Sequence, residues 1–260
     1  MRFVDVPPGL RLEYEGWDWS VAWSYEGAIT TWRLKSPEGR HRFLKVRAVE
    51  EPPRLLDEAR RLEWARAHLP VPEVVCHGTE GDVDWLLLES LPGRDATAAD
   101  LTAQPERLVP VLAEGLRRFH EAPVDRCPFR LTVEDALVSV RRRVDLGQAE
   151  HGDLHPEFSH LSLDQALASL QELAPTTEDL VVCHGDYCFP NVLVEGDAVT
   201  GYLDLGELAV ADRWWDLAVA SWSTTWNVGP GWEELFLDSY GIDPNPSRIT
   251  FYRLLYDLIS

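Results

Sequence analysis

The 260-residue sequence has few cysteines, a single methionine and no long apolar run. Its four cysteines, Cys76, Cys127, Cys183 and Cys188, are scattered without the spacing of metal ligands, so we expect reduced thiols that pack in the fold. No apolar stretch reaches the roughly 20 residues that a membrane-spanning helix needs. The first residues contain no apolar signal-peptide core, and a cytoplasmic protein is therefore expected.

Basic residues are also scarce. The chain has 24 Lys and Arg against 44 Asp and Glu, which gives a formal net charge of −20 at pH 7. This charge argues against nucleic acid and anionic membranes as partners, and it would attract a polycationic small molecule. It would also repel free ATP, so a nucleotide site needs Mg²⁺ and a local cation. The acidity can equally serve solubility alone, and nothing in the sequence indicates a protein partner.

The chain does contain a polar motif with the spacing of a phosphoryl-transfer site. Asn191 stands five residues after the aspartate of His184-Gly185-Asp186, and Asp204 follows a predicted β-hairpin. Kinases use this layout to hold a base and Mg²⁺ around the phosphates of a nucleotide. Asn191 and Asp204 each offer an oxygen to this hard ion, and Asp186 remains available to accept a proton from a substrate hydroxyl. All three are common turn residues, but their joint spacing favours the catalytic interpretation.

The predicted hairpin determines how Asn191 and Asp204 are related. Apolar runs at 192–194 and 199–203 flank a short turn-forming sequence. A turn centred near Asp197 or the next residue would place Asn191 opposite Asp204. A turn centred one residue earlier would shift that register by about two positions.

A second His-Gly-Asp sequence, at residues 151–153, lacks the rest of the motif. Phe158 stands where the asparagine would be, and no hairpin ending in Asp follows. We therefore reject residues 151–153 as the catalytic loop.

The secondary-structure pattern divides the chain near residue 90. Before that point the sequence predicts strands and one helix, with strands at 27–34, 41–46 and 83–89 and the helix at 55–68. The remainder is mainly helical, with predicted helices that include 163–173, 214–222 and 249–259. Leu91-Pro92-Gly93 interrupts the pattern. We accordingly expect an N-terminal nucleotide-binding lobe at 1–91 and a catalytic and substrate-binding lobe at 92–260.

The N-terminal region supplies candidates for nucleotide binding. Lys45 lies on the predicted strand at 41–46, from which a lysine can reach the α- and β-phosphates, and Glu58 on the following helix can hold its ammonium group. Either residue taken alone would be assigned to the surface. Gly27 is the single glycine of its turn, which has no GxGxxG, and its backbone is a weaker candidate for phosphate contacts. Ser90 and Leu91 can offer backbone groups to an adenine edge, as kinase hinges do.

These motifs resemble those of the aminoglycoside phosphotransferases, most closely the aminoglycoside 3′-phosphotransferase branch. Nearly the whole chain takes part, and the matching segments are residues 69–74, 119–129, 184–194, 210–216 and 251–258. The resemblance implies an α+β, two-lobe protein-kinase-like fold, with a small antiparallel sheet and one helix in the first lobe and mainly helices in the second. It also implies transfer of the γ-phosphoryl group of ATP or GTP to the 3′-hydroxyl of an aminoglycoside antibiotic, with resistance as the consequence.

By the same resemblance, Asp186 would be the catalytic base. Asn191 and Asp204 would bind two Mg²⁺, and Lys45, paired with Glu58, would hold the nucleotide phosphates. The drug pocket of the family is acidic, and the matching positions here are Asp153, Glu157 and Asp257. Their carboxylates would bind the ammonium groups of the drug. A solvated acidic surface is the competing interpretation of these three residues.

One position departs from the branch pattern. Glu207 stands where the branch usually has an arginine, and related macrolide kinases carry an acidic residue near this place. A kinase of another small molecule, such as a macrolide or a choline-like amine, therefore remains an alternative. A non-catalytic nucleotide-binding module is another, although the retention of all five kinase-type residues argues against it. A protein kinase is disfavoured because the chain has no long activation segment.

Overall fold

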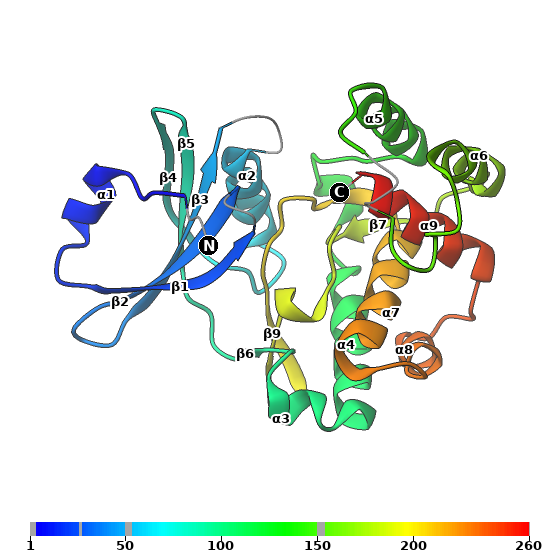
Figure 1. Cartoon of the computed structure of the whole chain (residues 1–260). Helices are drawn as coiled ribbons and strands as arrows, with labels where there is room; N and C mark the ends of the chain where they lie inside the picture. Colours follow the sequence, from blue (N-terminus) through cyan, green and yellow to red (C-terminus); the bar gives the residue numbers. More distant parts are fainter. Residues whose placement is uncertain (1–3, 26–27, 50–53, 150–153, 260) are drawn as a thin grey trace. The chain divides into compact units, whose positions relative to one another are not determined.

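The computed structural model describes residues 4–25, 28–49, 54–149 and 154–259 (Figure 1). The chain divides into two compact units. Unit 1 comprises Met1–Gly93 and Thr200–Gly206, and unit 2 comprises Arg94–Val199 and Glu207–Ser260. Within the described residues, the helices are too short and too polar to cross a membrane.

Unit 1 is built on a five-stranded antiparallel sheet with strand order β1-β2-β3-β5-β4 (Figure 1). Its strands are β1 (Asp18–Tyr25), β2 (Ile29–Lys35), β3 (His41–Ala48), β4 (Val74–Glu80) and β5 (Val83–Glu89). Its helices are α1 (Pro8–Glu13) and α2 (Leu55–Ala65).

The two faces of this sheet are covered differently. One face carries a cluster of buried residues that includes Leu44 and Val46 of β3, packed with Leu10 and Tyr14 from the segment around α1. Side chains alternate along a strand, so Lys45 projects from the opposite face. Helix α2 packs against β4 and β5. The alternation of β3 thus separates an apolar layer from a face that presents a buried cation.

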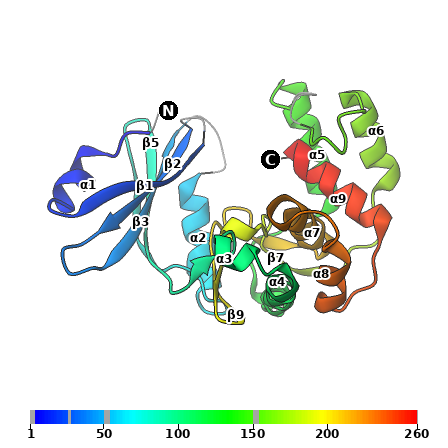
Figure 2. The same ribbon diagram turned by 60° about the horizontal axis from the view of Figure 1, so that its bottom comes forward.

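Unit 2 is mainly helical. Its helices are α3 (Ala99–Thr102), α4 (Pro105–Phe119), α5 (Val133–Asp145), α6 (Leu163–Leu173), α7 (Trp214–Val228), α8 (Glu233–Tyr240) and α9 (Pro246–Ile259), with single 3₁₀ turns η1 (Val124–Arg126) and η3 (Phe189–Asn191). Helix α9 packs against α5, α6 and α7, and α4 packs against α8 (Figure 2). Helix α7 is buried along most of its length. These contacts fix the elements that carry the polar motif.

Short strands position the polar loops. Strand β7 (Leu180–Cys183) pairs with β10 (Ala209–Asp212), while β6 (Arg94–Asp95), β8 (Val192–Glu195) and β9 (Ala198–Tyr202) form a second small sheet. The turn between β8 and β9 is centred between Gly196 and Asp197, and Gly196 has the positive φ (61°) that this tight turn requires. The turn is one residue earlier than the position that would place Asn191 opposite Asp204. The hairpin therefore does not place Asn191 opposite Asp204, and the register is shifted by about two positions.

The expected α+β class is confirmed: a five-stranded antiparallel sheet with helix α2 is followed by a mainly helical region. Unit 1 also contains a short second helix, α1, where one helix was predicted. The predicted strand at 83–89 and the predicted helix at 163–173 have the observed bounds. The predicted helix at 55–68 is shorter, because hydrogen-bonded turns replace it after Ala65.

Candidate active site

In unit 1, Lys45 lies between two carboxylates. Its Nζ donates to Glu58 Oε1 at 2.6 Å and lies 3.0 Å from Asp204 Oδ1. Lys45 and Glu58 are buried, whereas the Asp204 side chain is half-exposed. Burial alone would lower the pKa of Lys45, but the two carboxylates outweigh it and raise this pKa above its usual value. The lysine therefore stays charged and presents a fixed cation on this face of the sheet.

Asp204 has an unusual backbone conformation. Its φ is +58°, and it is the only non-glycine residue with positive φ in the part of the chain that the structure describes. Aspartate tolerates this left-handed region better than most residues because its short side chain can bond locally. The conformation, shortly after β9 ends at Tyr202, brings the carboxylate to the ammonium of Lys45.

In unit 2, the carboxylate of Asp186 accepts three side-chain hydrogen bonds. Cys188 Sγ and Tyr256 Oη donate to Oδ1 at 3.0 and 2.9 Å, and Asn191 Nδ2 donates to Oδ2 at 2.8 Å. Burial, followed by the nearby Asp186 carboxylate, raises the pKa of both the Cys188 thiol and the Tyr256 phenol. Both groups are therefore protonated, neutral donors. Asp186 has no cation against it among the described residues.

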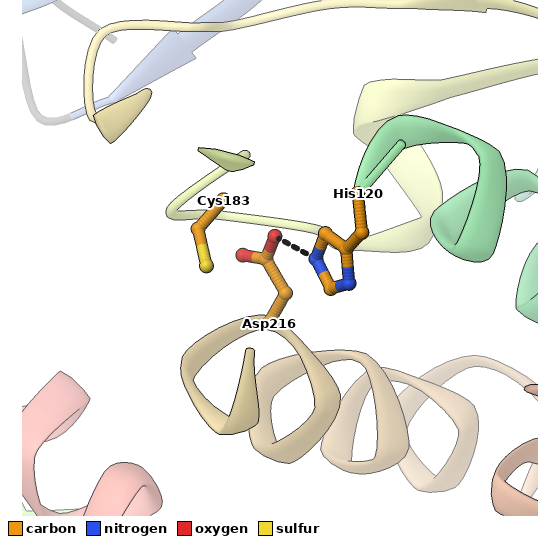
Figure 3. A group of neighbouring side chains, drawn as sticks. All are labelled: His120, Cys183 and Asp216. Carbon is orange, nitrogen blue, oxygen red and sulfur yellow. Dashed lines mark hydrogen bonds and ion pairs between the residues drawn. The ribbon is translucent and has the colours of Figure 1, made fainter. Parts of the chain in front are cut away.

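The loop that carries Asp186 is held by hydrogen bonds to a buried carboxylate, that of Asp216 on α7 (Figure 3). Asp216 Oδ2 accepts the His184 N–H at 2.6 Å, and Oδ1 accepts the Gly185 N–H at 2.9 Å. His120 Nε2 contacts Asp216 Oδ2 at 3.0 Å, and its Nδ1 contacts Tyr240 Oη at 2.8 Å. We did not predict this support from the sequence, although Asp216 lies in the segment 210–216 that contributes to the resemblance.

His120, Cys183 and Asp216 bring potential metal-ligand atoms within 4.8 Å of one another. The hydrogen bonds of Asp216 already use both of its oxygens, and the Cys183 thiol donates to the Asp212 carbonyl at 3.3 Å. Burial, followed by the charges of Asp216 and Asp212, raises the pKa of Cys183 well above its usual value. Because a cysteine ligates metal as the thiolate, this cluster is better described as a hydrogen-bonded support than as a metal site.

Glu207 lies directly behind the same loop. Gly185 has a φ of +90°, and a Cβ at this position would lie 2.5 Å from the Glu207 Cβ and 2.7 Å from its carbonyl oxygen. Only glycine fits such a close approach with this backbone. The Glu207 side chain is exposed. The residue at the position of the branch arginine thus approaches the Asp186 loop through its backbone and Cβ.

Asn191 and Asp204 suit Mg²⁺ in their ligand chemistry. Asn191 uses Nδ2 to donate to both Asp186 Oδ2 and the Asp186 carbonyl, which orients its amide and leaves the side-chain oxygen as the available acceptor. Asp204 is a half-exposed carboxylate. Hard oxygen atoms with access to solvent are what Mg²⁺ requires, because it keeps several waters.

The residues expected to bind substrate are only partly described. Asp153 and Gly27 lie outside the described residues. Glu157 Oε2 lies 3.3 Å from Arg253, and Asp257 Oδ2 accepts the His155 N–H at 2.8 Å. Burial and the neighbouring Glu157 raise the pKa of Asp257 to about 6, although the His155 hydrogen bond opposes this. Glu157 and Asp257 therefore lie near each other, and Arg253 offsets part of the charge of Glu157.

The expected hinge follows β5. Ser90 and Leu91 are outside the strand, and their backbone groups make no hydrogen bond to other described residues. The preceding Glu89 is fixed at both ends, because its N–H donates to the Glu73 carbonyl at 2.9 Å and its side chain pairs with Arg42 at 2.6 Å. The strand end is thus held while the next backbone groups remain available to a ligand.

Comparison with known proteins places the chain in a family. Residues 26–252 match the model of the phosphotransferase enzyme family. An aminoglycoside 3′-phosphotransferase of Streptomyces fradiae is 36% identical over 95% of this chain and 97% of its own length. The crystal structure of an aminoglycoside 3′-phosphotransferase of type VIII is similar, with a TM-score of 0.86, 35% identity and 96% of each chain covered. A Streptomyces rimosus aminoglycoside phosphotransferase, solved with ADP and streptomycin, has a TM-score of 0.78 at 27% identity, again with 96% of each chain covered. The chain therefore belongs to the phosphotransferase enzyme family.

Proposed function

We propose that this protein transfers the γ-phosphoryl group of a nucleoside triphosphate to the 3′-hydroxyl of an aminoglycoside. The observation that carries the proposal is the bridging position of Lys45 between Glu58 and Asp204. This is the arrangement by which kinases hold a phosphate-binding lysine beside a metal-binding aspartate. The similarity to aminoglycoside 3′-phosphotransferases over almost the whole chain supports the choice of acceptor.

The reaction uses Asp186 as the general base. The acceptor oxygen attacks the γ-phosphorus, its proton passes to the Asp186 carboxylate, and the bond from the γ-phosphorus to the β,γ-bridging oxygen breaks to release the nucleoside diphosphate. The support from Asp216 keeps the loop rigid, since it fixes the two backbone N–H groups that precede Asp186. Rigid placement of the base increases the rate of phosphoryl transfer, because this reaction depends mainly on positioning and charge.

Lys45 binds the α- and β-phosphates, and the backbone groups of Ser90 and Leu91 bind the adenine or guanine edge. Asn191 and Asp204 would hold two Mg²⁺. When bound, these ions neutralise phosphate charge, which a protein of net charge −20 would otherwise repel. Lys45 supplies the fixed local cation, and its burial against Glu58 keeps it in place before the nucleotide arrives.

The acceptor is cationic. Glu157 and Asp257 would bind its ammonium groups, and the raised pKa of Asp257, about 6, leaves this carboxylate mostly ionised at pH 7. The overall negative charge of the chain favours approach of a polycation. Phosphorylation of the drug would cancel part of its positive charge and so weaken its contacts to ribosomal RNA, with resistance as the consequence.

The test is turnover with separate acceptors. Nucleoside diphosphate release should be stimulated by kanamycin and neomycin in the presence of Mg²⁺, and not by erythromycin or choline. Kanamycin and its 3′-deoxy analogue form a matched pair, because only the first carries the proposed acceptor hydroxyl. Turnover with the 3′-deoxy compound would refute the 3′ assignment. Turnover with erythromycin or choline alone would refute the substrate class, and nucleotide binding without turnover on any acceptor would indicate a binding module.

A further inference from the structure

The hydrogen bonds to Asp186 distinguish its two oxygens. A carboxylate oxygen accepts about two hydrogen bonds. Oδ1 accepts one from Cys188 at 3.0 Å and one from Tyr256 at 2.9 Å, and is therefore filled. Oδ2 accepts one from Asn191 at 2.8 Å. Among the described residues, one lone-pair position is left, and it is on Oδ2.

The Tyr256 end of the contact is fixed by packing. Helix α9 packs against three other helices, and Leu254, Leu255 and Leu258 around Tyr256 are fully buried. The phenol itself is only partly buried, at the end of a rigid element. Such a side chain can hold a partner in place at a small cost in conformational entropy, because a tyrosine has few rotatable bonds.

The Asp186 end is fixed by backbone contacts. The Gly185 N–H donates to Asp216, and the Gly185 carbonyl accepts from Trp215 Nε1 at 2.9 Å. These bonds fix the backbone from which the Asp186 side chain projects. The direction of the carboxylate is consequently set by Tyr256 and Cys188 on one oxygen and by Asn191 on the other.

We propose that Tyr256 is a positioning residue that fills Oδ1 of Asp186 and so directs the acceptor hydroxyl to Oδ2. This inference rests on the proposed function and deepens it, because it names the atom that takes the acceptor proton. Cys188 assists as the weaker donor. The neutral phenol suits this task, since it orients the carboxylate without the ion pair that a lysine or arginine would impose.

The experiment is steady-state kinetics of Tyr256→Phe on an acceptor that the wild-type protein turns over. The variant keeps the ring and removes only the hydroxyl. We expect kcat to fall about tenfold, as for the loss of one hydrogen bond to a charged group, while the KM for the acceptor and for the nucleotide change less than twofold. Cys188→Ala should lower kcat by a smaller factor, and the double variant should be slower than either.

Tyr252→Phe is the matched control. Tyr252 lies one turn earlier on α9, packs against Trp215 and Phe251, and gives no hydrogen bond to Asp186. Its variant should retain wild-type kcat. A kcat of Tyr256→Phe within twofold of wild type would overturn the proposal. A raised KM with unchanged kcat would instead make Tyr256 an acceptor-binding group, and a raised kcat would make the contact inhibitory; each also overturns it. Absence of turnover in the wild-type protein would count against the proposed function itself.

Discussion

The two units hold their important carboxylates by opposite means. In unit 1, Asp204 lies 3.0 Å from the ammonium of Lys45, which is itself anchored by Glu58. In unit 2, Asp186 is surrounded by neutral donors, namely a thiol, a phenol and an amide. The Asp204 carboxylate is held by a fixed positive charge. The Asp186 carboxylate is held by directed hydrogen bonds from neutral groups, which orient it without an ion pair.

This difference matches the two proposed roles. A metal ligand should remain ionised throughout the reaction, whereas a base must change its charge within it. The sequence separates the two aspartates only by their order and spacing in the motif, and does not show what surrounds either carboxylate. The environment, built from residues far away in the chain, provides the distinction, and variants of either environment test it.

The largest effect should follow from Asp186→Asn. The variant keeps the shape of the side chain but cannot accept the acceptor proton, so kcat should fall about a thousandfold. The thermal midpoint should change little, because an amide oxygen can still accept from Tyr256 and Cys188. Stopped-flow or coupled turnover measures the first, and calorimetry the second. Turnover near the wild-type rate would show that the neutral-donor carboxylate is not the base.

The next effect concerns the support of the unit 2 loop. Asp216→Ala leaves the N–H groups of His184 and Gly185 and the ring of His120 buried without their acceptor. We expect the free energy of unfolding to fall by about 3 kcal/mol. Urea unfolding followed by tryptophan fluorescence measures it. Asp238→Ala on α8, at an exposed carboxylate, is the control and should cost less than about 0.5 kcal/mol. Equal losses in the two variants would contradict the supporting role of Asp216.

The cation of unit 1 can be removed with a close control, because the chain has only two lysines, Lys35 and Lys45. Lys45→Met should lower kcat/KM for the nucleotide about a hundredfold, as for the loss of a preorganised charge beside phosphate. Lys35→Met, at an exposed strand end, should have no effect. Glu58→Gln should cost less than Lys45→Met, since Asp204 still holds the ammonium. A larger loss of kcat/KM in Glu58→Gln than in Lys45→Met would contradict the role of Lys45 in binding the phosphates.

The smallest effect concerns Asp257, whose pKa is raised to about 6. The folded protein then binds this proton more tightly than the unfolded chain does, so the contribution of Asp257 to stability is lost as pH rises from about 4 to about 6. Asp257→Asn removes that loss. Relative to wild type, the variant should gain about 1 kcal/mol between pH 4 and pH 6, after allowance for solvent around the partly exposed carboxylate. Urea unfolding at both pH values measures it, and a constant difference would contradict the raised pKa.

The elements predicted well from the sequence are those with local signals at their ends. Helix α6 begins as predicted because Ser162 and Gln165 form a reciprocal capping box. Strand β1 was not predicted, although Trp19, Val21, Trp23 and Tyr25 recur at every second position as in a strand. Its place at the sheet edge leaves most of its residues exposed. Helix α7 continues past the predicted end at Trp222 to Val228, because tertiary packing buries residues that have no strong helix propensity, such as Thr224.

In the candidate site, too, the sequence predicts local features better than contacts between distant residues. The pairing of Lys45 with Glu58 is present in the structure and was expected from their order, although their role in nucleotide binding stays a prediction. The contact of Tyr256 with Asp186 joins residues 70 positions apart, and that of His120 with Asp216 joins residues 96 apart. A phenol or an imidazole gives no periodic or spacing signal. Such contacts depend on how helices pack, which a single sequence does not specify.

The left-handed backbone at Asp204 sets the stability of the protein against its activity. Holding a residue other than glycine at a φ of +58° costs about 1 kcal/mol. Asp204→Gly would release this strain, and Glu58 would still pair with Lys45. A library selected only for heat resistance should therefore accept glycine at this position, and a library selected for turnover should reject it. Laboratory evolution under the two selections would show whether stability and turnover favour different residues at position 204.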